Sequence, residues 1–119
     1  MKKLGDLQVY QIALQLSDKA WSIYQILPKE FRYEMGSQFL RAVDSIGANI
    51  AEGYGRFHYK DSMKFYYNAR GSLWESKHWL LLLYKRKLIE DDTFDQFLNT
   101  IETLGKKLNN FIGRLKDAK

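Results

Sequence analysis

Few residues of this chain have the types and spacing that metal chemistry needs. Glu75 and His78 have the Glu-x-x-His spacing of di-iron helical bundles, whose sites combine two such motifs with two further glutamates. The sequence holds one copy, and its other histidine, His58, falls in an expected loop. There is no cysteine to supply a thiolate ligand. We therefore expect no metal and no cofactor.

Nucleophilic catalysis finds no better support in the sequence. Neither histidine has a serine and an acid arranged as in a hydrolase triad, and the lack of cysteine removes a thiol nucleophile. The chain also carries no phosphate-binding loop and no dinucleotide fingerprint. We expect a protein that is not an enzyme.

Polar side chains on two expected helices form the next candidate site, because they occupy positions on or beside the apolar stripe. Spacings of three and four put them on one side of each helix: Arg41, Ser45, Asn49 and Glu52 on the first, Arg70 and Glu75 on the second. In an antiparallel pair, Arg41 would face Glu75, and Glu52 would face Arg70. Partly buried charges need partners, so this pattern predicts salt bridges that fix the register of the helices. The alternative is a polar binding or catalytic pocket, and we favour the structural interpretation.

Basic residues are the candidates for nucleic-acid contact, because lysine and arginine neutralise phosphates while nearby aromatic rings stack on bases. They lie in two expected loops and in the C-terminal segment: Arg56, Lys60, Lys85, Arg86, Lys87, Lys106, Lys107, Arg114 and Lys116, with Lys2, Lys3 and Lys119 in addition. For any single cluster a solvated rim is the simpler interpretation. Symmetric assembly would combine such patches into a basic ring.

Composition agrees with a globular protein that could bind a polyanion. The chain has 119 residues, 45% of them hydrophobic, and a formal net charge of +5. The N-terminal residues include no apolar run of the kind found in signal peptides. The longest apolar run, residues 79–84, has six residues, whereas a membrane span needs about 20. We expect a cytoplasmic protein with no membrane contact.

Apolar residues repeat at spacings of three and four in four segments, which predicts helices at about 6–27, 37–54, 59–86 and 92–116. Short connections between four such segments are typical of an antiparallel bundle. The sequence therefore predicts an all-α, up-down-up-down four-helix bundle that forms one domain over residues 1–119.

Capping residues give the expected helix boundaries. Asp6 would cap the first helix, and Pro28 would end it. Ser37 would cap the second helix, with a start nearer Glu30 as the alternative. The glycine-rich residues 53–55 would close that helix in the left-handed conformation.

Two features of the helices suggest close contacts with neighbours. Gly47 and Gly71 lie inside expected helices, where glycine costs about 1 kcal/mol relative to alanine, so we expect them to let helices approach closely. Residues 79–84 are apolar all round the helix. A second apolar face needs a second partner, which predicts self-association.

Three sequence blocks together suggest a family. They are Asp6-Leu-x-Val-Tyr10, the stretch from Gln38 to Arg56 with its Asn-Ile-Ala-Glu-Gly core, and Ala69-Arg-Gly-Ser-Leu-x-Glu75. This combination closely resembles the four-helix bundle proteins encoded in 23S rRNA intervening sequences. That family is similar to the accessory variability determinant proteins of bacterial diversity-generating retroelements. The chain departs from the family pattern at Gly47, usually proline, and at His58, usually a serine that caps the third helix.

The resemblance implies a ring-shaped homopentamer with a central pore. It also implies binding to structured nucleic acid or to a reverse transcriptase. Taken with the residues, it predicts a non-enzymatic oligomeric interaction module that binds RNA or DNA. The alternative is a structural or protein-binding adaptor with no nucleic-acid role.

Overall fold

Four long helices make up most of the computed structural model, which describes residues 2–118. In chain order they are α1 (Gln8–Ile26), α3 (Ser37–Tyr54), α4 (Tyr59–Lys85) and α5 (Asp91–Ala118). α2 (Lys29–Phe31) is a single short turn, and no strand occurs in the described part of the chain. The prediction of an all-helical fold with four main helices is confirmed. None of these helices is long and apolar enough to span a membrane.

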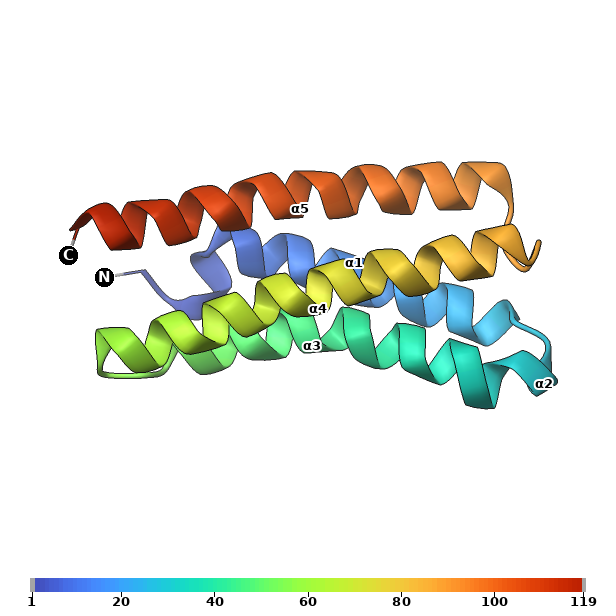
Figure 1. The fold of residues 1–119 in the computed structure, drawn as a ribbon, viewed down its shortest axis with the longest axis horizontal. Coiled ribbons are helices and arrows are strands. Elements are labelled where there is room, and N and C mark those ends of the chain that lie inside the picture. The colour runs from blue at the N-terminus through green and yellow to red at the C-terminus, as the bar shows by residue number, and fades with distance from the viewer. Residues whose placement is uncertain (1, 119) are drawn as a thin grey trace.

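The molecule is elongated, with extents of 46 × 23 × 21 Å. Figure 1 shows both termini and the α3–α4 connection at one end, which we call the terminal end. The α4–α5 connection and α2 lie at the opposite end. Residues that are distant in sequence are therefore gathered at each end.

One core joins the four long helices. α1 and α4 each pack against both α3 and α5, so each helix has two neighbours. The rings of Phe39 and Phe97 meet across the core, with centroids 5.3 Å apart. Full burial of one such large apolar side chain stabilises the fold by about 1.5–3 kcal/mol. The largest fully buried side chains include Phe39, Phe97, Leu16, Leu27, Ile46, Ile50, Leu80 and Leu83.

The two ends of α1 differ in how well the sequence predicts them. Asp6 belongs to a preceding 3₁₀ turn, and its Oδ2 accepts the backbone N–H of Lys3 at 3.2 Å. The prediction that Asp6 caps α1 is therefore wrong, since α1 begins at Gln8 after the buried Leu7, with no side-chain cap. At the other end, the residue before Pro28 is extended and the helix stops, as predicted.

The chain is already helical well before α3. α2 leads directly into a π-helical turn, Arg32–Gly36, and then into α3. Ser37 therefore has helical dihedrals and is not an N-cap; its hydroxyl donates to the carbonyl of Arg32 at 3.0 Å. The alternative start near Glu30 describes this segment better. A Cβ at Gly36 would lie 2.9 Å from Cδ1 of Leu27, so glycine permits this turn to pack on α1.

α3 does not end in a left-handed glycine. Gly55 has φ −81° and ψ −6°, and no described glycine has a positive φ, so that prediction is wrong. Gly53 instead allows α4 to come close, because a Cβ there would lie 2.7 Å from Cε1 of Tyr66. The positive φ in the described chain belongs to Lys87, at 60° in the α4–α5 connection.

The two mid-helix glycines behave differently. A Cβ on Gly47 would lie 3.5 Å from Cβ of Ala13, which is ordinary packing between α3 and α1. Gly71 is exposed, and a Cβ there would meet no atom within 4 Å. Close packing at Gly71 is therefore a wrong prediction for contacts within this chain.

Candidate nucleic-acid interface

The predicted basic residues divide between the two ends of the molecule. Arg56 and Lys60 flank the α3–α4 connection, and Arg114 and Lys116 lie near the end of α5, so these four share the terminal end (Figure 1). Residues 85–87 lie at the α4–α5 connection, at the opposite end. The structure thus brings two of the predicted groups together and separates the third from them.

A pocket of about 340 Å³ opens where the start of α1 meets the end of α5. We call it the terminal pocket. Its walls combine basic, amide and apolar side chains: Lys2, Leu7, Gln8, Val9, Lys107, Asn110, Phe111, Arg114 and Leu115. Two of the predicted nucleic-acid contacts, Lys107 and Arg114, are therefore lining residues of one pocket.

Among the described residues, no acid pairs with the cations of this pocket. Among residues 2–118 the ion pairs are Arg56–Glu52 and Lys77–Glu102, and neither involves Lys2, Lys107 or Arg114. Three positive groups around one concave site produce a positive potential that attracts anions. The site is therefore suited to a negatively charged ligand.

One long-range and one local hydrogen bond hold the N-terminal segment against this site. The hydroxyl of Tyr54, in the last turn of α3, donates to the carbonyl of Lys2. Nε2 of Gln11 donates to the carbonyl of Gly5 at 2.9 Å. These bonds fix the backbone that carries the lysine, and the buried Leu7 anchors the same segment in the core. The pocket exists because α3 and α1 position the residues that precede α1.

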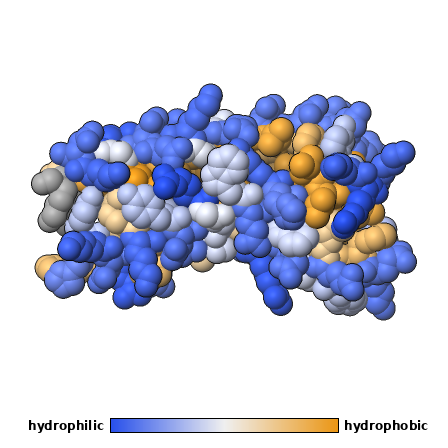
Figure 2. Space-filling model, viewed as in Figure 1, coloured by the Kyte–Doolittle hydropathy of each residue, from blue (hydrophilic) through white to orange (hydrophobic). Residues whose placement is uncertain are grey.

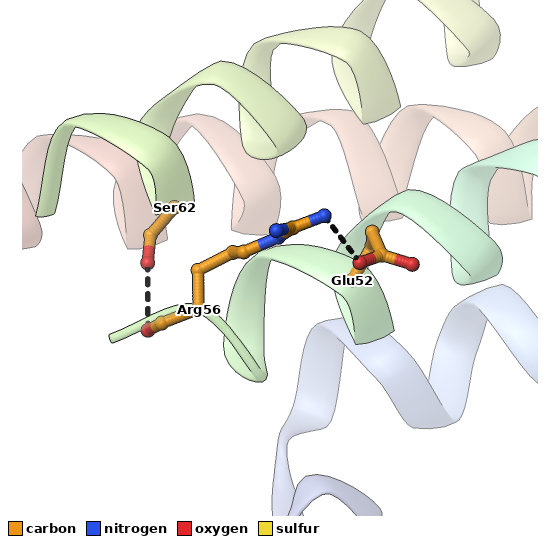
Figure 3. A network of polar contacts seen from close by, with 3 residues as sticks. All are labelled: Glu52, Arg56 and Ser62. Carbon is orange, nitrogen blue, oxygen red and sulfur yellow. Dashed lines mark hydrogen bonds and ion pairs between the residues drawn. The ribbon is translucent and has the colours of Figure 1, made fainter. Parts of the chain in front are cut away.

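The guanidinium of Arg56 is less free to bind a phosphate than the other cations of the terminal end, because it already has partners within the protein. Figure 3 shows its Nη2 directed at Oε2 of Glu52, at 2.9 Å, and its carbonyl accepting from the hydroxyl of Ser62 at 3.3 Å. Its guanidinium also lies 4.7 Å from the ring centroid of Phe65. These contacts tie the end of α3 to the start of α4. Arg56 therefore acts first as a structural residue of the α3–α4 connection.

The α3–α4 connection also presents an aromatic side chain to solvent. Phe57 is 94% exposed, and its ring meets His58 edge-on with centroids 5.2 Å apart. Lys60 is exposed three residues further on. The terminal end therefore carries an exposed aromatic ring and an exposed lysine in one short segment.

The opposite end of the molecule carries both basic and acidic side chains. Nη1 of Arg86 lies 3.7 Å from Sδ of Met35. The hydroxyl of Tyr84 donates to Oδ1 of Asp91 at 2.8 Å, which raises the pKa of the tyrosine. Glu90 and Asp91 follow the basic residues 85–87 after two apolar residues, so acids offset part of the positive charge there.

The predicted salt bridges between α3 and α4 do not form. Glu52 pairs with Arg56 instead of Arg70. Nη1 of Arg70 donates to Oδ1 of Asn109 at 3.4 Å, which joins α4 to α5. Arg41 is exposed and lies in no ion pair of the described chain, and Glu75 accepts from Nε1 of Trp79 at 3.1 Å. Long charged side chains reach solvent or local partners at this surface.

Small neutral groups occupy the α3–α4 contact where salt bridges were expected. The hydroxyl of Ser72 donates to the hydroxyl of Ser45 at 3.0 Å, and Nδ2 of Asn49 donates to the same oxygen at 3.0 Å. Ser76 is fully buried and donates to the carbonyl of Ser72 at 2.8 Å. The structural interpretation of Ser45 and Asn49 thus has a geometric basis, although the charged partners were misassigned.

Sequence reasoning missed several residues of this region. Lys77 pairs with Glu102 at 2.8 Å and joins α4 to α5, and no motif singles it out. Gln8 and Asn110 line the terminal pocket, yet both are ordinary polar positions on helices. Placing α1 beside α5 with opposite directions would have brought these two amides near each other. The described residues contain no group of three or more potential metal ligands.

The chain belongs to the 23S rRNA-intervening sequence protein family, whose model matches residues 5–110. A crystal structure of a protein of unknown function from the S23 ribosomal protein family of Bacteroides thetaiotaomicron is similar, with a TM-score of 0.83 and 26% sequence identity. That similarity covers 88% of this chain and 95% of the other. No curated protein matches the chain. The family and its solved relative are thus of unknown function.

Proposed function

We propose that this protein is a non-enzymatic, oligomeric interaction module that binds RNA or DNA through its terminal end. The observation that carries the proposal is the group of three cations around the terminal pocket: Lys2, Lys107 and Arg114. None has an acidic partner among the described residues. Phosphate groups are the natural counterpart of such a cluster, and aromatic groups such as Phe57 stack on bases.

Equilibrium binding at several salt concentrations tests this proposal. A labelled RNA hairpin and its DNA counterpart should bind at about 50 mM salt and weaken steeply as salt rises, because bound phosphates release counterions. Replacing Lys2, Lys107 and Arg114 by glutamine should abolish most of this binding. If neither nucleic acid binds at about 50 mM salt, the nucleic-acid role is refuted and the adaptor function is left.

Self-association is the second part of the proposal, and exposed residues of α4 support it. Trp74 is 63% exposed and Leu81 is 47% exposed, and with Gly71 they follow spacings of three and seven along one side of α4. On the face of the molecule seen in Figure 2, apolar side chains gather over the half where α4 ends and α5 begins. A stripe with such spacing suits a helix of a second copy.

A homopentamer is the assembly that we propose, following the family resemblance. Sedimentation at micromolar concentration should give a mass about five times that of the 14.1 kDa chain. A monomer alone would refute self-association.

The same exposed stripe also favours a second candidate function, a protein-binding adaptor whose partner could be a reverse transcriptase. Association with such a protein without any nucleic-acid binding would favour that candidate.

We also propose that the four helices alternate in direction within one domain. Contacts between α3 and α4 support this order, because residue numbers fall on one helix as they rise on the other. Ser45 contacts Ser72, whereas the later Gly53 lies against the earlier Tyr66.

A cytoplasmic location remains part of the proposal.

A further inference from the structure

We propose that the terminal pocket receives one unpaired nucleotide, so that the protein prefers bulged or single-stranded nucleic acid to a continuous duplex. This inference rests on the proposed nucleic-acid function and adds the form of nucleic acid that is recognised. A pocket of about 340 Å³ lies near the lower end of the roughly 300–1,000 Å³ range of small-molecule sites. A continuous duplex keeps its bases stacked inside, so it could touch the rim of this pocket but not fill it.

The apolar wall of the pocket is suited to the face of a base. Leu7 and Val9 are buried on the α1 side, and Phe111 and Leu115 lie on the α5 side. The Phe111 ring is held edge-on against the ring of Tyr66, with centroids 5.1 Å apart. A supported aromatic ring next to aliphatic groups offers a base the stacking and apolar contact that it loses when it leaves a helix.

Two side-chain amides can meet the edge of that base. Gln8 and Asn110 both line the pocket, one from each helix. Neither side chain makes a hydrogen bond to another described residue. Each amide carries both donors and an acceptor, which is what the edges of nucleobases require. No other described residue therefore competes with a base for these groups.

The cations are placed to hold the phosphates on either side of an inserted nucleotide. Lys107 and Arg114 are seven residues apart on α5, which is about 10 Å along a helix axis. Lys2 approaches from the N-terminal segment. A free anion or an acidic peptide would use the same charges, but neither would need the apolar wall and the two amides together.

A pair of hairpins tests the inference. Both have the same stem and loop, and one carries a single bulged 2-aminopurine nucleotide; RNA and DNA versions separate the two kinds of nucleic acid. We expect at least one bulged hairpin to bind about 10-fold more tightly than its continuous counterpart, which is the effect of stacking one base. Stacking on Phe111 should also quench the 2-aminopurine fluorescence.

Variants that fill the pocket show whether it causes this preference. Asn110→Trp, at an exposed position, should remove the preference for the bulge, so that the bulged and continuous hairpins bind with affinities within twofold of each other. Asn99→Trp is the matched control on the same helix, exposed and outside the pocket, and should keep the preference. If Asn110→Trp lowers the melting temperature, Gln8→Trp fills the pocket from the α1 side instead.

Three results would overturn the inference. Equal affinity for the bulged and continuous hairpins, with both binding salt-dependent, refutes the nucleotide pocket and leaves the proposed function in place. If the pocket-filling variants weaken the binding of both hairpins equally, these residues contact the sugar-phosphate backbone of any nucleic acid and do not hold an unpaired base. Failure of every hairpin to bind at about 50 mM salt refutes the proposed function as well.

Discussion

The hydroxyl of Ser72 donates a hydrogen bond to the hydroxyl of Ser45 across 3.0 Å and joins α4 to α3. Nδ2 of Asn49 donates to the same Ser45 oxygen, so one atom connects three side chains. All three side chains are half-buried. Small neutral groups therefore make the polar contact between these two helices, whereas the neighbouring charged residues do not pair across it.

Removal of this hydrogen bond should destabilise the fold measurably. Ser72→Ala and Ser45→Ala should each lower the free energy of unfolding by about 1 kcal/mol, and their double-mutant cycle should give a coupling of about 0.5–1.5 kcal/mol. Arg41→Ala and Glu75→Ala are the controls and should cost less than about 0.5 kcal/mol, since both residues are exposed. Urea denaturation measures all four. A cost above about 1 kcal/mol for both charged residues, with coupling between them, would revive the predicted salt bridge.

Gly53 should tolerate no side chain. A Cβ there would lie 2.7 Å from the Tyr66 ring and 3.0 Å from the carbonyl of Ser62, so Gly53→Ala should destabilise by about 1–3 kcal/mol. Gly113→Ala is the control on α5, where a Cβ would meet nothing within 4 Å; it should stabilise by about 0.5–1 kcal/mol through helix propensity. Thermal unfolding compares the two. A stabilising Gly53→Ala would show that α4 does not approach α3 so closely.

Stability should fall at high pH because of Tyr66. Burial, with the nearby Tyr54 phenol as a second cause, raises the pKa of Tyr66 from 10.0 to about 12. Between these values the unfolded chain binds fewer protons than the folded chain, so the free energy of unfolding decreases as pH rises. The contribution is intact below pH 10, and the difference between the two pKa values corresponds to roughly 2–3 kcal/mol lost by pH 12.

Denaturation curves from pH 9 to 12 on Tyr66→Phe would isolate this effect, since the variant should lose less stability over that interval than the natural chain. Tyr67→Phe, which changes a more exposed neighbour, serves as the control and should follow the natural chain. The same pH dependence in all three proteins would contradict the role of Tyr66.

Charge on the exposed stripe of α4 should disrupt the proposed assembly. Trp74→Glu puts a carboxylate where a second copy would pack, so the sedimenting mass should fall toward that of the single chain. Trp21→Glu is the matched control, because Trp21 is 51% exposed on α1 and lies outside the stripe. Dissociation by Trp21→Glu with no effect from Trp74→Glu would move the interface to α1.

Local patterns in the sequence were enough to predict the main helices. Apolar spacing predicted four of them, and Pro28 predicted the end of α1. Caps were less predictable, because Asp6 bonds to Lys3 in a preceding turn and leaves α1 to begin without a side-chain cap. The helical turns before Ser37 depend on packing against Leu27, a contact that no local pattern encodes.

The candidate site was predicted only in part. Lys107 and Arg114 were chosen for their charge, and that choice says nothing about the pocket they share. The pocket depends on contacts between distant segments, above all the bond from Tyr54 to the carbonyl of Lys2. The long side chains of Arg41 and Glu52 were assigned partners by helix geometry alone. Such side chains have many rotamers, so a nearby partner such as Arg56 prevails over a distant one.

The most direct test of the central claim compares the salt dependence of hairpin binding in two triple variants. One replaces Lys2, Lys107 and Arg114 by glutamine; the other replaces Lys85, Arg86 and Lys87 at the opposite end, with the same loss of charge. Each lost phosphate contact should reduce the slope of log K against log salt by about 0.7–0.9. We predict a slope reduced by about two units in the first variant and unchanged in the second. Equal slopes in both variants, or a reduction confined to the second, would contradict binding at the terminal end.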